Sequence, residues 1–252
     1  MNYKNIKIEN RENYAIIEIA NNKNNSLDQK TLKEISHAAI SFNRIKKLKC
    51  IGLKGNSKFF SPGADVKELE KLSQKKAKRI NLFQDVDNLL KINIPIISFV
   101  RGYALGGGFE LALSTDLIIS SENAKFGFPE INLGIIPGIG GTQKTKRFTS
   151  NQNIKYLAMT GEVIDSLTAY KYGIVSQIIP DKNFENFSLS FLKKISSKPR
   201  LSLIKIKELV NLDTNFKNSL QIERKEFYKL LDSKNKKIGI KSFLTKKKPN
   251  WD

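Results

Sequence analysis

Short apolar segments with the two-residue alternation of β-strands recur along the first part of the chain, and stretches of helical periodicity lie between them. The predicted strands cover residues 14–19, 50–53, 96–100 and 116–120. One helix is predicted from Leu32, Ile35, Ala39, Phe42 and Ile45, and a looser helical pattern runs through Leu69, Leu72, Ile80, Phe83 and Leu90. Strands that alternate with helices indicate an α/β fold with a largely parallel sheet.

The strand pattern ends near Pro199, and the rest of the chain has the apolar periodicity of helices. These helices are predicted to be separated near Asp213 and Thr214. Such a segment is too small to build a large core, so we expect it to dock on the main domain, on a neighbouring subunit or on both. We therefore divide the chain into a core domain, residues 1–196, and a C-terminal helical segment, residues 197–252. The apolar positions of that segment are Leu201, Ile204, Leu209, Leu220, Phe227, Leu230 and Leu231.

Composition narrows the classes of protein that remain. The chain starts without an apolar signal segment, and no apolar run approaches the roughly 18 residues that span a bilayer, so we expect a cytoplasmic protein with no membrane partner. Cys50 is the only cysteine, which excludes an internal disulfide and a cysteine-based metal site, and no metal is expected. Its apolar neighbours predict a buried strand position rather than a nucleophile. His37, the sole histidine, lies on a periodic helix and is predicted to be a surface or packing residue.

The formal net charge of +20 raises the alternative that the basic surface binds nucleic acid. The lysines are spread along the chain among many asparagines and isoleucines, a composition expected from the codon bias of an AT-rich genome. The composition therefore favours the codon explanation, with nucleic-acid binding as the non-enzymatic alternative. Such binding would show a steep dependence of affinity on salt.

Two glutamates lie in apolar, glycine-marked sequence, Glu110 within residues 105–113 and Glu130 within residues 126–131. If the fold buries them, lost hydration raises their pKa values and suits them to proton transfer near neutrality. Taken singly, each has a structural alternative. Glu110 would then be a buried hydrogen-bonded carboxylate, and Glu130 a helix cap or the partner of a lysine.

Two turns carry backbone N–H groups to predicted helix starts. Pro62 and Gly63 indicate a turn, and Asp65 with Glu68 resembles a capping box that places the N–H of Ala64 just before a helix. The glycines at 106–108 follow the strand at 96–100 and open a short helix that contains Glu110. If the turns converge, their N–H groups would form an oxyanion hole. The structural alternatives are an ordinary strand-to-helix turn and tight packing at glycine.

These segments, in this order and spacing, resemble the crotonase superfamily and most closely the enoyl-CoA hydratases. The resemblance covers nearly the whole chain. It implies a crotonase (ClpP-like) spiral of ββα units followed by C-terminal helices that build homotrimers, and hexamers as dimers of trimers. It also implies an acyl-CoA substrate and no further cofactor. The motifs that carry it are residues 60–65, 95–97, 102–112, 126–130, 134–143, 157–161 and 169–175.

The resemblance also implies a set of site residues and an activity. The N–H groups of Ala64 and Gly107 would hold the thioester carbonyl oxygen, and Glu110 with the N–H of Gly138 would hold the attacking water. Glu130 would deliver or remove the proton at Cα. The implied reaction is the reversible syn addition of water to a 2-enoyl-CoA, giving a 3-hydroxyacyl-CoA in fatty-acid breakdown by β-oxidation.

For coenzyme A itself, the resemblance implies contacts from Lys67, Phe227, Phe243 and Lys246, the last three reaching a neighbouring subunit's site. The chain departs from the family in the loop at 22–27, which lacks the usual Arg-Pro. Two other activities of this superfamily remain open. The segments 101–103 and 108–113 also resemble carnitinyl-CoA dehydratases, which hydrate crotonobetainyl-CoA, and an enoyl-CoA isomerase would act through Glu130 alone.

Overall fold

The computed structural model describes residues 3–251, whose strands form two sheets. The larger sheet has the order β1 (Ile6–Asn10), β2 (Tyr14–Ile19), β3 (Cys50–Lys54), β5 (Ile96–Val100), β7 (Leu117–Ser121) and β10 (Gln177–Ile179). All its pairs are parallel except β1 with β2. The smaller sheet has the order β4 (Phe59–Ser61), β6 (Tyr103–Leu105), β8 (Lys125–Gly127) and β9 (Val163–Asp165). The predicted strands and the largely parallel sheet are confirmed.

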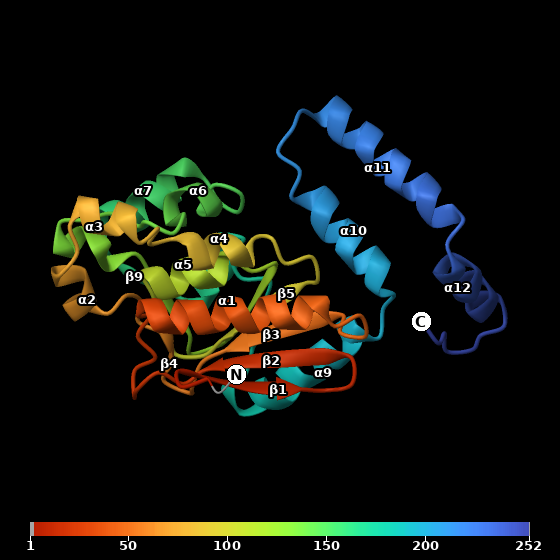
Figure 1. The fold of residues 1–252 in the computed structure, drawn as a ribbon, viewed down its shortest axis with the longest axis horizontal. Helices are drawn as coiled ribbons and strands as arrows, with labels where there is room; N and C mark the ends of the chain where they lie inside the picture. Colours follow the sequence, from red (N-terminus) through yellow and green to blue (C-terminus); the bar gives the residue numbers. More distant parts are fainter. Residues whose placement is uncertain (1–2, 252) are drawn as a thin grey trace.

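A ββα unit repeats along the chain. Its first strand joins the larger sheet, its second joins the smaller one, and a helix follows. The units are β3–β4–α2 (Val66–Glu70), β5–β6–α5 (Gly107–Leu113) and β7–β8–η1, where η1 (Pro129–Leu133) is a 3-10 helix. This repeat confirms the predicted spiral (Figure 1). Because β4, β6 and β8 are neighbours in one sheet, the turns that follow them meet at one edge.

The larger sheet buries both faces, and the alternation of side chains along β2 decides which residue faces which layer. Ala15, Ile17 and Ile19 join the cluster formed with α1 (Gln29–Arg44), whereas Tyr14 and Ile16 join the cluster formed with α9 (Phe184–Ser196). The predicted helix at 32–45 is therefore α1.

Cys50 is fully buried in the cluster against α9, where its thiol packs beside the backbone of Leu192. Burial raises the pKa of this thiol to about 12. The predicted packing role of Cys50 is confirmed, because a thiol that stays protonated is a poor nucleophile.

The looser helical pattern at 69–90 forms three short helices, α2, α3 (Gln74–Arg79) and α4 (Gln84–Leu89), rather than one. Ser73 caps α3 through its hydroxyl, and Asn81 interrupts the chain with a positive φ of 47°. Only α4 buries residues, Val86 and Leu89. The predicted apolar positions are therefore not core positions, since Phe83 and Leu90 are exposed and none of the five is buried.

The chain between β8 and the C-terminal segment supplies the remaining small elements. They are α6 (Gly141–Thr145), α7 (Asn151–Thr160), α8 (Ser166–Lys171) and the 3-10 helix η2 (Asp181–Asn183). No helix within residues 3–251 is long and apolar enough to cross a membrane.

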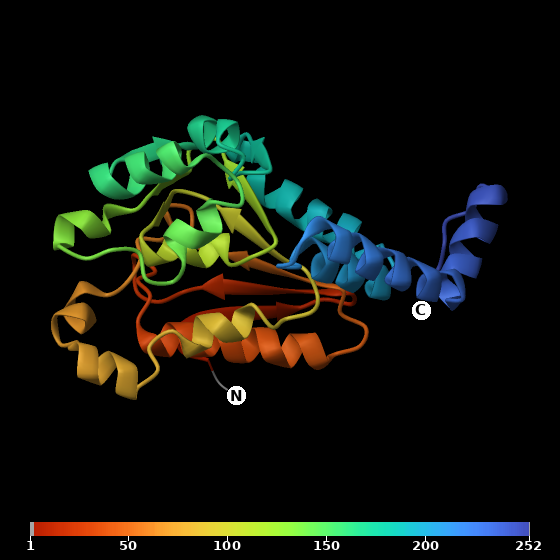
Figure 2. The same ribbon diagram turned by 90° about the horizontal axis from the view of Figure 1, so that it is seen from above.

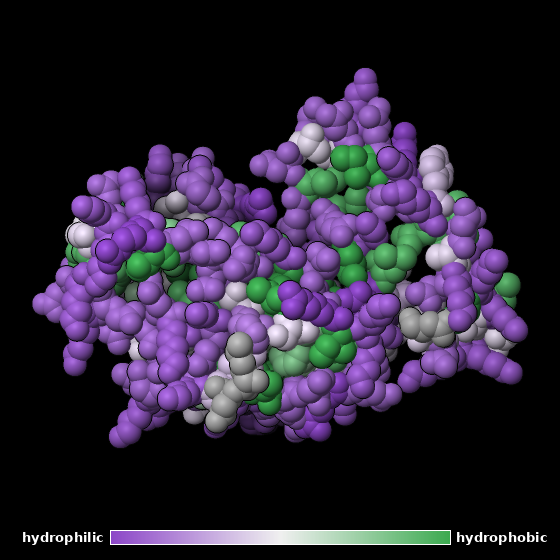
Figure 3. All heavy atoms as spheres, in the orientation of Figure 1, coloured by the Kyte–Doolittle hydropathy of each residue, from purple (hydrophilic) through white to green (hydrophobic). Residues whose placement is uncertain are grey.

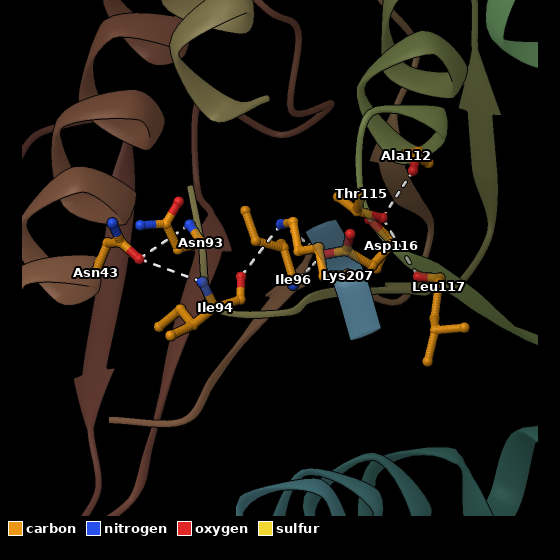
Figure 4. A network of polar contacts seen from close by, with 10 residues as sticks. Asn43, Asn93, Ile94, Ile96, Ala112, Thr115, Asp116, Leu117 and Lys207 are labelled. Carbon is orange, nitrogen blue, oxygen red and sulfur yellow. Dashed lines mark hydrogen bonds and ion pairs between the residues drawn. The ribbon is translucent and has the colours of Figure 1, made fainter. Parts of the chain in front are cut away.

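The C-terminal segment begins with α10 (Arg200–Val210), which a buried polar network attaches to the larger sheet (Figure 4). Lys207 Nζ donates to the Asp116 carboxylate at 2.8 Å and to the carbonyl of Ile94 at 3.2 Å. The same carboxylate accepts the N–H of Ile96 at 2.7 Å. A half-buried ion pair with further hydrogen bonds thus fixes α10 beside the start of β5.

The helices α11 (Phe216–Leu231) and α12 (Lys234–Leu244) stand away from the core, and neither buries a residue (Figures 1 and 2). Figure 3 shows hydrophobic atoms over this part of the molecule, whereas the visible face of the core is mostly hydrophilic. Phe216 is 82% exposed and Phe243 is 84% exposed. Large apolar side chains in such numbers mark an interaction surface. The predicted break near Asp213 and Thr214 lies between α10 and α11.

Candidate active site

The first turn of the site follows β4 and ends at α2. Asp65 is the N-cap, and its carboxylate accepts the N–H of Glu68 at 3.3 Å. The reciprocal half of the predicted capping box is absent. The Glu68 carboxylate instead accepts the N–H of Gln29 at 3.2 Å, and the N–H of Asp65 donates to the carbonyl of Leu27 at 3.4 Å. The carbonyl of Leu27 therefore takes the place of the Glu68 carboxylate as the acceptor of the Asp65 N–H.

The loop at 22–27, which contains Leu27, braces the turn. Leu27 pairs with Ala64 as a parallel bridge, and its N–H donates to the carbonyl of Gly63 at 2.8 Å. The Asn25 side-chain amide donates to the carbonyl of Phe59 at 3.0 Å. The loop thus fixes the peptide that carries the N–H of Ala64.

The second turn follows β6, where three glycines allow close packing. A β-carbon on Gly108 would lie 2.2 Å from the carbonyl oxygen of Ser61, so only glycine lets α5 approach β4 this closely. Gly106 has a φ of 50°, in the left-handed region, and is the N-cap of α5. The predicted short helix opened by glycines is confirmed.

The two turns converge. A β-carbon on Gly63 would lie 3.0 Å from the nitrogen of Gly107, and one on Gly107 would lie 3.6 Å from the nitrogen of Ala64. Within residues 3–251 neither N–H donates to a protein acceptor. Two adjacent, unpaired N–H groups at helix starts can together hold an oxygen that carries negative charge.

Glu110 lies on α5 and is only 2% exposed. Its Oε1 accepts the N–H of Ile139 at 2.8 Å and that of Gly141 at 2.6 Å. Burial raises the pKa of this carboxyl, while the N–H groups of Gly141, Ile139 and Gly138 and the positive charge of Lys144 oppose the rise. The backbone of the loop before α6 and the start of α6 therefore holds the Glu110 carboxylate through its Oε1.

Glu130 lies in the first turn of η1. Its Oε1 lies 3.0 Å from the position of a β-carbon on Gly106, and its buried Oε2 has no hydrogen-bond partner within residues 3–251. Burial, with a smaller contribution from the negative charge of Glu110, raises the pKa of Glu130 to about 7. The site therefore contains a carboxyl that can hold or release a proton near neutrality.

Replacing Glu130 with Gln is expected to stabilise the fold in alkaline solution. The unfolded chain ionises this carboxyl near its ordinary pKa of 4.5, whereas the folded chain keeps the proton up to about pH 7. The contribution of Glu130 to the free energy of unfolding is therefore fully present below pH 4.5, and it is lost as the pH rises through about 7. Urea unfolding of both proteins should give Glu130→Gln a gain that is larger near pH 8 than near pH 4 by about 1–3 kcal/mol. An equal difference at the two pH values would contradict the buried, ionising carboxyl.

Gly138 lies in the loop between η1 and α6 and is exposed. A β-carbon there would lie 3.1 Å from the ring of Phe83, the residue that precedes α4. The sequence hypothesis named Gly138 but missed Ile139 and Gly141, whose N–H groups donate hydrogen bonds to the Glu110 carboxylate. The sequence feature that could have identified the Gly141 N–H is the pair Gly140 and Gly141. A helix that starts at Gly141 leaves the N–H of that residue without a partner inside the helix.

The residues expected to contact coenzyme A do not meet within one chain. Lys67 is exposed in the first turn of α2, next to Ala64. Phe227 lies on α11, Phe243 on α12, and Lys246 just beyond α12, at the end of the molecule opposite α2 (Figures 1 and 2). A site that uses all of them would need two copies of the chain.

The other candidates from the sequence are structural. The Nδ1 of His37 is 2.8 Å from the hydroxyl of Tyr3, so the histidine packs on α1 away from the two turns. No cluster of three or more His, Cys, Asp or Glu side chains within residues 3–251 is arranged to hold a metal ion.

Comparisons with known proteins identify the family and the fold. The profile of the enoyl-CoA hydratase/isomerase family matches residues 9–252. A probable mitochondrial enoyl-CoA hydratase of Dictyostelium discoideum is 36% identical over 229 residues, which cover 90% of this chain and 83% of that protein. The crotonyl-CoA hydratase of Syntrophomonas wolfei is 34% identical over 257 residues, covering 100% of this chain and 99% of that one. An enoyl-CoA hydratase subunit I of Geobacillus kaustophilus superposes with a TM-score of 0.95 at 36% identity and covers 99% of this chain and 98% of that one.

Proposed function

Because the chain belongs to the enoyl-CoA hydratase/isomerase family, we propose that it is an enoyl-CoA hydratase, a hydro-lyase that adds water reversibly to a 2-enoyl-CoA. The product is a 3-hydroxyacyl-CoA, and the substrate is carried as a coenzyme A thioester without a separate cofactor. One observation carries the proposal. A buried carboxyl, Glu110, and a half-buried one, Glu130, both have raised pKa values and lie near two helix starts whose N–H groups have no acceptor within residues 3–251.

The N–H groups of Ala64 and Gly107 hold the thioester carbonyl oxygen. Water addition at Cβ places enolate-like negative charge on this oxygen in the transition state. Two preorganised donors and the positive end of α5 stabilise that charge without reorganising at the moment of reaction. The proposal is supported by the close approach of Gly63 to Gly107, which brings the two donors near each other.

The two carboxyls move protons in opposite senses. Glu110 accepts a proton from water as the water oxygen bonds to Cβ, with the N–H of Gly138 helping to hold that water. Glu130 gives its proton to Cα, and both groups act on the same face of the double bond. Three backbone N–H groups and a nearby lysine favour the ionised form of Glu110, while burial favours the protonated form of Glu130.

This assignment gives the pair of carboxyls one shared proton in either direction of reaction. Hydration starts with the proton on Glu130, and dehydration starts with it on Glu110. Since both forms carry the same total charge, kcat/KM for the two directions rises and falls with pH in parallel.

The C-terminal segment at 197–252 serves assembly into a homotrimer, or a hexamer built from two trimers. Its exposed apolar side chains on α11 and α12 need a partner surface. Phe227, Phe243 and Lys246 then reach the coenzyme A of a neighbouring subunit, while Lys67 acts on the coenzyme A of its own. Lysines suit the phosphates of this ligand as mobile point charges. We assign the reaction to fatty-acid breakdown by β-oxidation.

The test is a side-by-side assay of the purified chain with crotonyl-CoA, crotonobetainyl-CoA and a 3-enoyl-CoA. We expect hydration of crotonyl-CoA, because both Glu110 and Glu130 are present. Preferred turnover of crotonobetainyl-CoA would replace the proposal with a carnitinyl-CoA dehydratase. Isomerisation of the 3-enoyl-CoA without hydration would replace it with an isomerase, and no turnover of any of the three would overturn it.

A further inference from the structure

Lys144 on α6 makes two short hydrogen bonds beside Glu110. Its half-buried Nζ donates to the Oγ of Ser114 at 2.6 Å and to the carbonyl of Ile139 at 2.7 Å. Ser114 is the C-cap of α5, the helix that carries Glu110, and Ile139 belongs to the loop before α6. One ammonium group therefore connects two elements that meet at the proposed base.

The contacts close a ring around Glu110. The Ser114 hydroxyl donates to the backbone carbonyl of Glu110 at 2.7 Å, and the N–H of Ile139 donates to the Glu110 carboxylate at 2.8 Å. Lys144 joins Ser114 to Ile139 and completes the ring. Both the main chain and the side chain of Glu110 are thus held through the same lysine.

The local backbone makes room for this lysine. Gly140 has a φ of 101°, and a β-carbon there would lie 3.0 Å from the Cε of Lys144. The ammonium also faces the C-terminal end of α5, where the helix dipole favours a positive charge. Moving a charged ammonium group partly out of water costs free energy, so the charge of this half-buried lysine needs specific hydrogen-bond acceptors.

We propose that Lys144 is a positioning residue for Glu110, which fixes α5 against the loop so that the N–H groups of Ile139 and Gly141 stay on one carboxylate oxygen. This inference rests on the proposed function of Glu110 as the group that activates water. The carboxylate then keeps one orientation for the water that it activates. Without the lysine, the loop and the helix end can separate, and the reacting atoms lose their alignment.

The charge of Lys144 has a second consequence. The charged groups that face it or the carboxyl pair are Glu110 on α5, Glu130 on η1, Asp87 on α4 and Arg147 beyond α6. Among them, the ammonium is the charge that opposes the rise in the pKa of Glu110. Its removal is expected to raise that pKa further, so the acid limb of the pH profile of kcat/KM moves to higher pH.

The test compares Lys144→Met, Lys144→Arg and Lys146→Met with the wild-type chain in hydration of crotonyl-CoA. Lys144→Met keeps an unbranched stem and removes the charge. We expect kcat to fall about 10- to 100-fold with little change in KM, as for misalignment at a reacting centre, and the acid limb to shift upward. Lys144→Arg should recover most of the activity. Lys146 is exposed on the same stretch of chain, and Lys146→Met should behave as wild type.

The outcomes separate the two hypotheses. If the wild type hydrates crotonyl-CoA and Lys144→Met matches it in kcat and pH profile, or changes only KM, the positioning role is wrong and the proposed function stands. If the wild type does not hydrate, both fall. Should Lys144→Met fail to fold by circular dichroism, Ser114→Ala removes the same bridge from the other side. An unchanged kcat in Ser114→Ala would then overturn the positioning role.

Discussion

Glu110→Gln and Glu130→Gln are each expected to lower the turnover of crotonyl-CoA by on the order of 10² to 10⁴, the range for loss of a general acid or base. Glutamine has the size of glutamate, so it fills the same buried volume. It cannot accept a proton from water in place of Glu110, and it cannot give one to Cα in place of Glu130. The loss should appear in kcat rather than in binding, because each group acts mainly in the transition state.

Steady-state kinetics with circular dichroism of each variant measures this effect, with Glu12→Gln as the matched control. Glu12 is an exposed glutamate at the β1–β2 turn and should be silent. Unchanged hydration in either folded variant would sink the two-carboxyl mechanism. An isomerase would give a different result, because Glu110→Gln would keep 3-enoyl-CoA isomerisation and Glu130→Gln would lose it.

Gly107→Pro is expected to lower kcat by on the order of 10² to 10³, the cost of removing one oxyanion donor. Gly107 is the first residue of α5, a position where proline fits the helix and removes only an N–H that has no helical partner. A β-carbon at this position would meet its nearest neighbours at 3.6 Å, an ordinary contact distance, so there is room for it.

Gly107→Ala is the matched control for this variant. Both substitutions add a β-carbon in the same place, so their difference reports the loss of the N–H together with the ring carbons that proline puts in its position. Alanine keeps the donor and should retain much more activity than proline, with similar thermal unfolding of the two. Equal hydration rates in the two variants would show that the N–H of Gly107 does not hold the thioester oxygen.

Much of the fold could be predicted because its signals are local. The alternation along 14–19 and the buried runs at 50–53 and 96–100 are typical of strands wherever they lie in a sheet. Only the Asp65 half of the predicted capping box forms, for the opposite reason. A distant residue, Leu27, pairs with the N–H that a local Glu68 cap would use, and no local pattern reveals which distant backbone will arrive there.

The candidate site divides in the same way. Glu110, Glu130 and the glycine turns were visible because apolar sequence around a carboxylate and repeated glycine are unusual patterns. The two N–H groups of Ile139 and Gly141, and the bridge made by Lys144, depend on how the loop before α6 folds back over α5. One lysine among so many carries no distinguishing mark in the sequence, and only the contacts of its ammonium group identify it.

The hydrogen-bond donors proposed for this site belong to the main chain. At Ala64 and Ile139, every codon change except one to proline leaves the N–H in the polypeptide. A genome that drifts toward lysine and asparagine codons can therefore rewrite most of the surface without erasing these donors. Gly108 is the counterexample, because any β-carbon there meets the carbonyl of Ser61 at 2.2 Å. The proposed donors therefore depend on the conformation of the backbone rather than on side-chain identity. Single substitutions disturb them mainly when they replace a glycine or introduce a proline.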